Sequence, residues 1–350
     1  MAESTAQNEP TPQNDSPGQN ESPTHDDHHI QPAIQVDVEA TETDSAYGNE
    51  LSVYSASLTS SVLDYRHENG RRYHGYRDGT YLLPNDEEEC DRLDMIHEMM
   101  LTLLGRKLFL APIGPSPQRV IDLGTGTGIW AIDFADQYPS AEVIGNDLSP
   151  TQPSLVPPNL KFVVDDIEAE WVYEDNQFDF IHARYLAHSI KDFRKLLRQC
   201  FNCTKPGGWV EFQDWDAMLK SEDGTTKGTA IERFYNEVLS AFEKAGYCTR
   251  PGPSLEQWFR EAGFVDIHVQ KYRIPMGAWP KDPHYKKLGI WNLLQAEPGY
   301  HAGAMAVLTR FESWSPEEVT VLAAQAVSDT KNPKIHAVFD FYVVYGRKPE

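Results

Sequence analysis

The stretch that decides the fold is residues 120–130, Val-Ile-Asp-Leu-Gly-Thr-Gly-Thr-Gly-Ile-Trp. A short apolar run is followed by a glycine-rich turn and then by the start of a helical pattern, which predicts a strand that turns sharply into a helix. Glycine is needed where the backbone turns tightly and where a ligand approaches main-chain N–H groups. A glycine-rich turn alone indicates a ligand site only weakly, so the residues around it decide.

Two features of this turn argue against a dinucleotide. The glycines are spaced G-x-G-x-G, and Ile129 stands where the dinucleotide fingerprint has Gly or Ala. Asp122 precedes the first glycine by two residues. Its carboxylate is unfavourable beside a pyrophosphate but favourable beside an ammonium or sulfonium group. The turn therefore favours S-adenosylmethionine over NAD and disfavours a nicotinamide-dependent oxidoreductase.

Acidic residues follow the next two predicted strands. Residues 142–146 lead into Asp147, which is placed to accept hydrogen bonds from both hydroxyls of a ribose. Residues 161–164 lead to Asp166, which we expect to bind an adenine amino group while the N–H of Ile167 meets a ring nitrogen. The alternative is that these acids simply end a strand. Because ligands bind beyond the carboxyl ends of parallel strands, we favour a nucleoside site.

The rest of the chain alternates short apolar runs with helical patterns. Alternation of this kind is typical of an α/β fold in which helices cover both faces of a parallel sheet. The predicted strands are residues 119–123, 142–146, 161–164, 178–183, 209–213, 265–272 and 336–345, and the predicted helices are a segment that starts at Pro84 and stops before Pro112, then 129–137, 190–203, 229–245, 255–262 and most of 274–335.

Residues 1–46 differ in composition from the remainder. They contain ten acidic residues, five prolines, no Lys or Arg and no aromatic residue. Such a segment cannot bury enough apolar surface to offset chain entropy, so we expect a disordered acidic tail. The alternative is an arm that binds a partner or is phosphorylated. Residues 47–115 are expected to form an N-terminal helical lid, and residues 116–350 the α/β domain.

Charge and composition exclude several classes. The chain has 31 Lys and Arg against 53 Asp and Glu, a net charge of −22, which opposes direct nucleic acid binding. No secretory signal begins the sequence, and its most apolar stretch, 101–113, is shorter than the ~20 residues that span a bilayer. Cys200 and Cys203 lack a second ligand pair, so we expect buried thiols and no metal site.

These residues resemble a known family. The order of the motifs is similar to that of seven-stranded class I S-adenosylmethionine methyltransferases, and the start of the domain resembles the fungal LaeA-like group. The first resemblance lies in residues 122–128, Asp147, residues 165–166, 178–181 and 205–209, and the second in residues 69–76, 81–86, 91–94, 147–153 and 157–159.

The resemblance implies an enzyme that uses S-adenosylmethionine as methyl donor. Such an enzyme would take part in the regulation or the biosynthesis of secondary metabolites. Its acceptor would be a protein or a small molecule, and velvet-type nuclear regulators are possible partners. The alternative is a cofactor-binding regulatory subunit without transfer activity, which the intact glycine loop argues against. We expect a soluble protein of the cytoplasm, the nucleus or both; with no Lys/Arg cluster, nuclear entry would need a partner.

The segment after the fourth strand is expected to line the methyl-transfer pocket. Arg184 would contact the cofactor carboxylate or pair with a surface acid. Methyl transfer needs alignment and exclusion of water more than a base, and where a base is needed His74, His97 or His182 are candidates. A lone histidine is more often structural. The candidate cofactor-binding residues are Asp122, Gly124, Thr125, Gly126, Gly128, Asp147, Leu148, Asp166, Ile167 and Arg184.

An aromatic cluster precedes the first long helix. Tyr73, Tyr76 and Tyr81 are candidates for substrate binding as a lid over the site, together with His74. Tyr76 is also a candidate catalytic residue. The alternative is that this segment packs on the edge of the sheet. If the cluster is a lid, Tyr76→Ala should impair turnover more than it impairs folding.

Overall fold

A computed structural model describes residue 62 and residues 64–350, so the predicted acidic tail lies outside the described residues. The strands are β1 (Arg66–Glu68), β2 (Arg71–Tyr73), β3 (Arg119–Leu123), β4 (Glu142–Asp147), β5 (Leu160–Val164), β6 (Phe178–Arg184), β7 (Thr204–Lys220), β8 (Val265–Pro275) and β9 (Val338–Arg347). The α-helices are α1 (Glu87–Leu103), α2 (Ile129–Gln137), α3 (Phe193–Cys203), α4 (Ala230–Lys244), α5 (Leu255–Ala262), α6 (Pro283–Phe311) and α7 (Pro316–Lys331).

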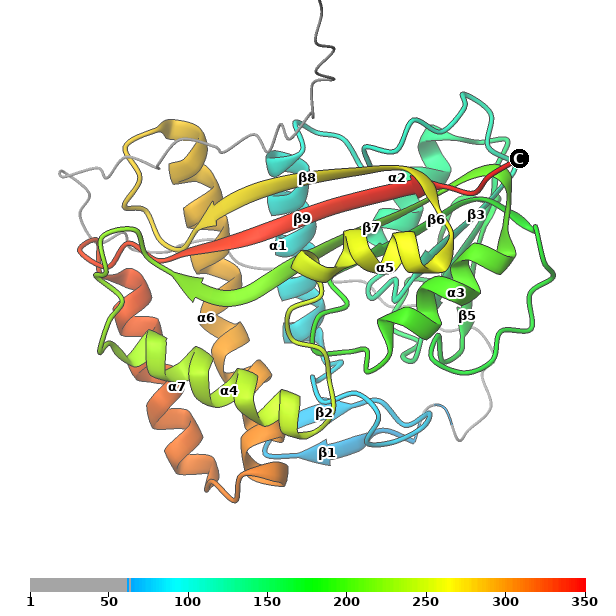
Figure 1. Cartoon of the computed structure of the whole chain (residues 1–350). Helices are drawn as coiled ribbons and strands as arrows, with labels where there is room; N and C mark the ends of the chain where they lie inside the picture. Colours follow the sequence, from blue (N-terminus) through cyan, green and yellow to red (C-terminus); the bar gives the residue numbers. More distant parts are fainter. Residues whose placement is uncertain (1–61, 63) are drawn as a thin grey trace, which may run out of the picture. The chain divides into compact units, whose positions relative to one another are not determined.

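The main sheet has seven strands in the order β5-β4-β3-β6-β7-β9-β8 (Figure 1). The first five strands in this order, β5, β4, β3, β6 and β7, are parallel to one another, and β9 is antiparallel to both of its neighbours. This confirms the predicted seven-stranded methyltransferase sheet. Asp122 lies opposite Gly145 on one side and His182 on the other, so the carboxyl ends of β3, β4 and β6 meet at one edge.

Helices cover both faces of this sheet, as predicted. Neighbouring residues of β3 point into different cores: Val120 packs with Trp130 and Phe134 of α2, whereas Ile121 packs with Leu196 of α3 and with α5. In Figure 1, α3 and α5 lie in front of the sheet and α2 lies behind it. Alternation along a strand therefore fills two separate apolar cores.

Strand β7 is longer than the sequence predicted. The expected strand ended at residue 213, whereas β7 continues to Lys220 and pairs with β9 over most of this length. The predicted strand stopped before the acidic residues that follow, but Asp216 is buried and ion-paired to Lys220 at 2.7 Å and Arg250 at 2.6 Å. The extension packs with α1, α4, α6 and α7 in a third core.

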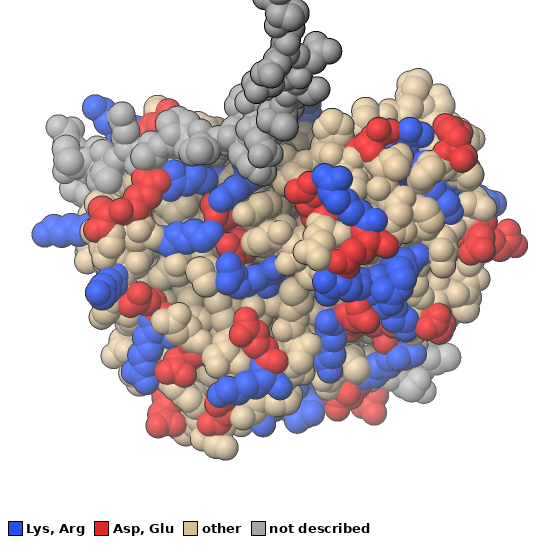
Figure 2. Space-filling model, in the orientation of Figure 1, with Lys and Arg blue, Asp and Glu red and all other residues tan. Residues whose placement is uncertain are grey.

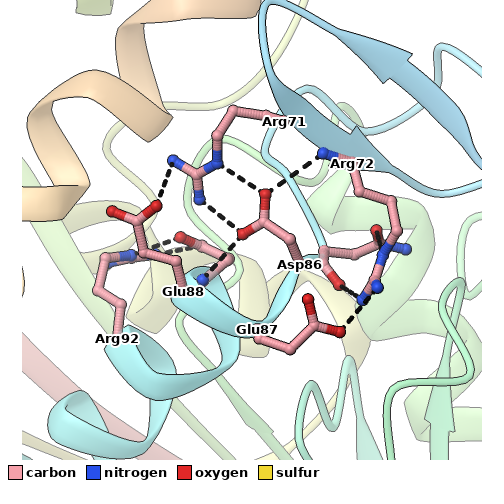
Figure 3. Close-up of polar contacts among 8 residues, drawn as sticks. Arg71, Arg72, Asp86, Glu87, Glu88 and Arg92 are labelled. Carbon is pink, nitrogen blue, oxygen red and sulfur yellow. Dashed lines mark hydrogen bonds and ion pairs between the residues drawn. The ribbon is translucent and has the colours of Figure 1, made fainter. Parts of the chain in front are cut away.

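A small hairpin of β1 and β2 precedes α1 and was not predicted. Asn69 and Gly70 form its turn, with φ of 49° and 77°. Arg71 of β2 donates to both carboxylate oxygens of Asp86 at 2.7 Å (Figure 3). Asp86 also caps α1 by accepting the N–H of Glu89 at 3.1 Å. The hairpin thus fixes where α1 begins.

Charged side chains of both signs share the described surface. Lys and Arg side chains lie among Asp and Glu side chains on the face drawn in Figure 2. Among the described residues, no helix is both long and apolar enough to cross a membrane. Cys200 and Cys203 are buried free thiols at the end of α3, as expected.

Candidate functional site

One cavity lies at the carboxyl ends of the parallel strands, where the sequence predicted a ligand. Its lining comes from the loops that follow β3, β4, β5 and β6, and from residues 80–85 with the first half of α1. The segment predicted as a lid therefore supplies part of the wall. The boundaries proposed at residues 46 and 115 stay predictions.

The glycine loop bends as its sequence requires. Gly126 and Gly128 have φ of 58° and 81°, a region that L side chains rarely adopt. A Cβ at Gly128 would lie 2.4 Å from the ring of Phe162, so a larger residue there would displace the ring. Gly128 is also the residue before α2, so the loop passes directly into the helix N-terminus.

Asp147 lies at the end of β4 and borders the cavity. Its two carboxylate oxygens accept the N–H of Gly126 at 2.8 Å and the N–H of Ser149 at 2.9 Å. Burial raises the pKa of Asp147 to about 6, although these amide donors oppose the shift. A carboxylate offers roughly four acceptor positions. The two amides leave capacity for the hydroxyl groups of a ribose.

Asp122, near the end of β3, holds the glycine loop through a hydrogen bond. One of its oxygens accepts the hydroxyl of Thr125 at 2.6 Å, and the other lies 2.7 Å from Nδ1 of His182. The His182 ring stacks on Trp130, with centroids 3.8 Å apart and planes 2° from parallel. Burial lowers the pKa of His182. This candidate base borders the cavity but is buried, and its Nε2 has no hydrogen-bond partner.

The loop after β5 forms a third side of the cavity. Asp166 and Ile167 both line it, as predicted, and Leu148 of the neighbouring loop lines it as well. Asp166 is ion-paired with Arg77 at 2.8 Å, and its other oxygen accepts the N–H of Glu168 at 2.8 Å. The contact with Arg77 brings the segment before α1 against the side expected to bind adenine.

Arg184 ends β6 and lines the cavity. Its Nη2 donates to Nδ1 of His97 at 2.8 Å, and Nε2 of His97 lies 3.0 Å from Asp133. Burial lowers the pKa of Arg184 to about 10. Among the described residues Arg184 makes no ion pair, so the predicted alternative of pairing with a surface acid is not what the structure contains. His97 itself lies outside the cavity lining.

The aromatic cluster divides into two groups. Tyr81 lines the cavity, whereas Tyr73, His74 and Tyr76 do not. Tyr73 is buried beneath the guanidinium of Arg310, 5.0 Å from its ring centre. His74 is buried against the edge of Tyr81, and Tyr76 lies against Arg77. Substrate contact by Tyr73 and Tyr76 stays a prediction, and so does the expected effect of Tyr76→Ala.

Sequence reasoning missed several residues of the cavity wall. Glu89 is buried, borders the cavity and accepts two hydrogen bonds from Arg92, at 2.6 and 2.8 Å. Arg92 lies over the ring of Tyr185, another lining residue, 5.6 Å from its centre. The acid-rich start of α1 was visible in the sequence, but only as a helix start. No feature of the nearby sequence indicates that Glu89 faces a cavity.

The side chains present suit S-adenosylmethionine. Asp147 keeps free acceptor positions for hydroxyl groups. The glycine loop leaves space beside the Leu186 side chain, because a Cβ at Gly124 would lie only 2.7 Å from it. Asp122 supplies negative charge beneath the loop, which favours a sulfonium. Arg184 supplies a guanidinium without a carboxylate partner. Each part of such a molecule therefore has a residue of complementary chemistry.

Comparisons with known proteins agree with this geometry. Residues 95–269 match the family model described as a methyltransferase domain. The methyltransferase pytC of Aspergillus terreus is 44% identical over 320 residues, covering 90% of this chain and 96% of that protein. The secondary metabolism regulator LAE1 of Cochliobolus heterostrophus is 36% identical over 290 residues, covering 81% and 94%.

A further relative is named protein-methionine methyltransferase laeA, from Emericella nidulans, and is 34% identical over 296 residues, covering 84% of this chain and 79% of that protein. These matches confirm the predicted enzyme class and its S-adenosylmethionine cofactor, and they do not favour a subunit without transfer activity. The chain belongs to the S-adenosylmethionine-dependent methyltransferases, in the group that includes the fungal LaeA-like proteins.

Proposed function

We propose that this methyltransferase acts in secondary metabolism and that its acceptor, a small molecule or a protein side chain, enters the cavity between α1 and the loop after β6. One observation carries the proposal: a single cavity joins the glycine loop and Asp147 to a second polar wall formed by Tyr81, Glu89 and Tyr185. The relatives named as regulators of secondary metabolism support the assignment to that process.

The donor side needs little chemistry from the protein. S-adenosylmethionine supplies a methyl group that its sulfonium already activates. The chain's own residues bind and orient: Asp147 accepts hydroxyl groups, the loop of Gly126 and Gly128 admits the ligand close to the backbone, and Asp166 and Ile167 are placed for the base. Holding two reactants in line accounts for much of the rate gain in such a transfer.

The acceptor side combines apolar and polar surface. Leu93 and Ile96 of α1 provide apolar contacts, and Tyr81, Glu89 and Tyr185 provide polar ones. Burial raises the pKa of Tyr81 well above its ordinary value, so its hydroxyl stays protonated and able to donate a hydrogen bond. These residues suit an acceptor that has both an apolar body and a polar group near the reacting atom.

The test is to incubate the pure protein with methyl-labelled S-adenosylmethionine and an extract of the source cells, beside an Asp147→Ala control. Label in organic-soluble material would identify a small-molecule acceptor, and label in a protein band a protein acceptor. If the wild-type protein binds the cofactor but transfers no label to either fraction, while a known methyltransferase labels its substrate in the same extract, the proposal fails.

Association with velvet-type nuclear regulators is a separate proposal, supported by the regulators among the relatives. Copurification of the tagged full chain from source cells, followed by identification of the bound proteins, tests it. Fractionation of the same cells into nuclei and cytoplasm tests the proposed location. A chain confined to the cytoplasm without such partners would contradict the regulatory role and leave the transfer activity intact.

A further inference from the structure

A half-buried arginine at the cavity makes no ion pair among the described residues. Arg184 lines the cavity, and within the described part of the chain its only hydrogen bond joins Nη2 to His97. Withdrawing a guanidinium from water without a directly bonded anion is unfavourable, and a bound anion would offset that cost. The bond to His97 uses one of the two N–H groups of Nη2. The other N–H of Nη2 remains, together with those of Nη1 and Nε, so one planar pair of donors that matches a carboxylate is still available.

The contact with Arg184 determines where the proton of His97 lies. A guanidinium can only donate, so Nδ1 of His97 must be the acceptor of the 2.8 Å bond from Nη2. The ring proton therefore sits on Nε2, which donates to Asp133 at 3.0 Å. Burial lowers the pKa of His97, which keeps the ring neutral. His97 thus connects Asp133 of α2 to Arg184 of β6 in one fixed direction.

We propose that Arg184 binds the carboxylate of the amino-acid half of S-adenosylmethionine and that His97, held by Asp133, is the positioning residue that aims Arg184 into the cavity. This inference rests on the proposed function, because it assumes that the adenosyl ligand occupies this cavity. It gives His97 a role other than that of a base. His97 is 2% exposed and does not border the cavity.

Two adenosyl ligands separate this proposal from a general effect on the site. S-adenosylhomocysteine has the amino-acid carboxylate, and 5′-methylthioadenosine lacks the amino-acid half entirely. Arg184→Gln should weaken binding of S-adenosylhomocysteine roughly 10- to 100-fold, the range for losing hydrogen bonds between charged groups. It should change the affinity for 5′-methylthioadenosine by less than about twofold. Titration calorimetry measures both affinities without any turnover.

Variants of His97 test its positioning role. His97→Leu removes the acceptor of the bond from Arg184 and should weaken binding of S-adenosylhomocysteine by roughly fivefold or more, again with little effect on binding of 5′-methylthioadenosine. His97→Asn places an acceptor oxygen close to the position of Nδ1 and should restore most of the affinity. Arg194→Gln is the matched control, because Arg194 is an exposed arginine of α3 that pairs with Glu261 and lies over the Trp258 ring, away from the cavity lining.

The possible results are distinct. A selective loss for the carboxylate-bearing ligand, with recovery in His97→Asn, supports the proposal. Equal losses for both ligands, or no loss for either, overturn it, because Arg184 would then be structural or irrelevant. If the wild-type chain binds neither adenosyl ligand, the proposed function itself fails, which is a different outcome from a failure of the variants.

Discussion

Asp122 of β3 and His182 of β6 lie directly opposite each other in the sheet, and their side chains meet at 2.7 Å beneath the glycine loop. The carboxylate accepts, so the ring proton lies on Nδ1. The Thr125 hydroxyl occupies the other oxygen of Asp122. The acid that first suggested a cationic ligand is therefore also the residue that holds the loop in place, and His182 fixes its orientation.

Replacing Asp147 should abolish tight cofactor binding. Asp147→Ala removes the acceptor for the ribose hydroxyls and releases the N–H groups of Gly126 and Ser149, so we expect at least a 100-fold loss of affinity for S-adenosylmethionine, on the order of 3 kcal/mol. Calorimetric titration measures it. Asp136→Ala, at an exposed position of α2, is the control and should bind normally. Unchanged binding in Asp147→Ala would place the cofactor elsewhere.

A methyl group at Gly128 should damage the loop. Gly128→Ala forces a side chain into a conformation with φ of 81° and to within 2.4 Å of the Phe162 ring. We expect loss of cofactor binding and a drop of about 1–3 kcal/mol in unfolding free energy, measured by urea denaturation. Gly114→Ala is matched to it, because its Cβ would meet open space. Equal behaviour of the two variants would contradict this account of the loop.

The contact between the hairpin and α1 should contribute as much to the unfolding free energy as several hydrogen bonds do. Asp86→Ala removes the cap of α1 and leaves the guanidinium of Arg71, which is 8% exposed, without its main partner. We expect a loss of at least about 2 kcal/mol in unfolding free energy. Glu88→Ala is the control, because Glu88 is 61% exposed and lies 3.7 Å from Arg71 (Figure 3). A loss as large in Glu88→Ala would assign the effect to surface charge.

Stability should depend on pH through Glu211 of β7. Burial raises its pKa from 4.5 to about 7, although the N–H groups of Leu110 and Ala111 oppose the shift by donating to it. Between these two pKa values the folded state binds more protons than the unfolded state. The unfolding free energy therefore falls as the pH rises through this window.

Glu211→Gln removes this titration. Between pH 5 and pH 8 the unfolding free energy of the variant should therefore fall by roughly 2 kcal/mol less than that of the wild type. Urea denaturation at both pH values measures the difference. Asp214 and Asp147 have raised pKa values as well and remain in both proteins, so the comparison isolates Glu211. Parallel pH profiles for the two proteins would show that Glu211 is ionised in the folded state at both pH values.

Deleting residues 1–46 should leave cofactor binding unchanged. The segment lacks aromatic residues and carries ten acidic residues without a Lys or Arg, so it offers little for a shared core. The shortened chain should bind S-adenosylmethionine within about twofold of the full chain. A large loss of affinity would show that the tail contributes to the site. The same deletion tests the proposed velvet association, because a partner-binding arm would be lost with it.

The predictable part of the site is the part built from local sequence. Asp147 and Asp166 were identified because the first ends β4 and the second lies two residues after β5, and parallel strands bring their carboxyl ends to one edge. Glu89 and Tyr185, 96 positions apart in sequence, were missed because they come together only through Arg92, which donates to Glu89 and lies over the Tyr185 ring. No spacing rule connects residues so distant.

Two parts of the fold were missed for different reasons. The predicted strand stopped at residue 213, before two acids that β7 in fact contains: Asp214 accepts the N–H groups of Leu186 and Ala187, and Asp216 is ion-paired. Burial of an acid depends on donors supplied by tertiary structure. The β1–β2 hairpin did carry a local signal, the Asn69-Gly70 pair typical of tight hairpins, but its three-residue strands show no apolar alternation.

The packing of α1 against α6 has a consequence for the order of synthesis. Arg92 of α1 donates to Gln295 of α6 at 3.0 Å, across 203 positions of sequence. At ribosomal speeds of about 5–20 residues per second, α1 leaves the ribosome at least ten seconds before its neighbour exists. During that interval the apolar face of α1 lacks its final partner. The nascent chain should therefore bind chaperones until α6 emerges.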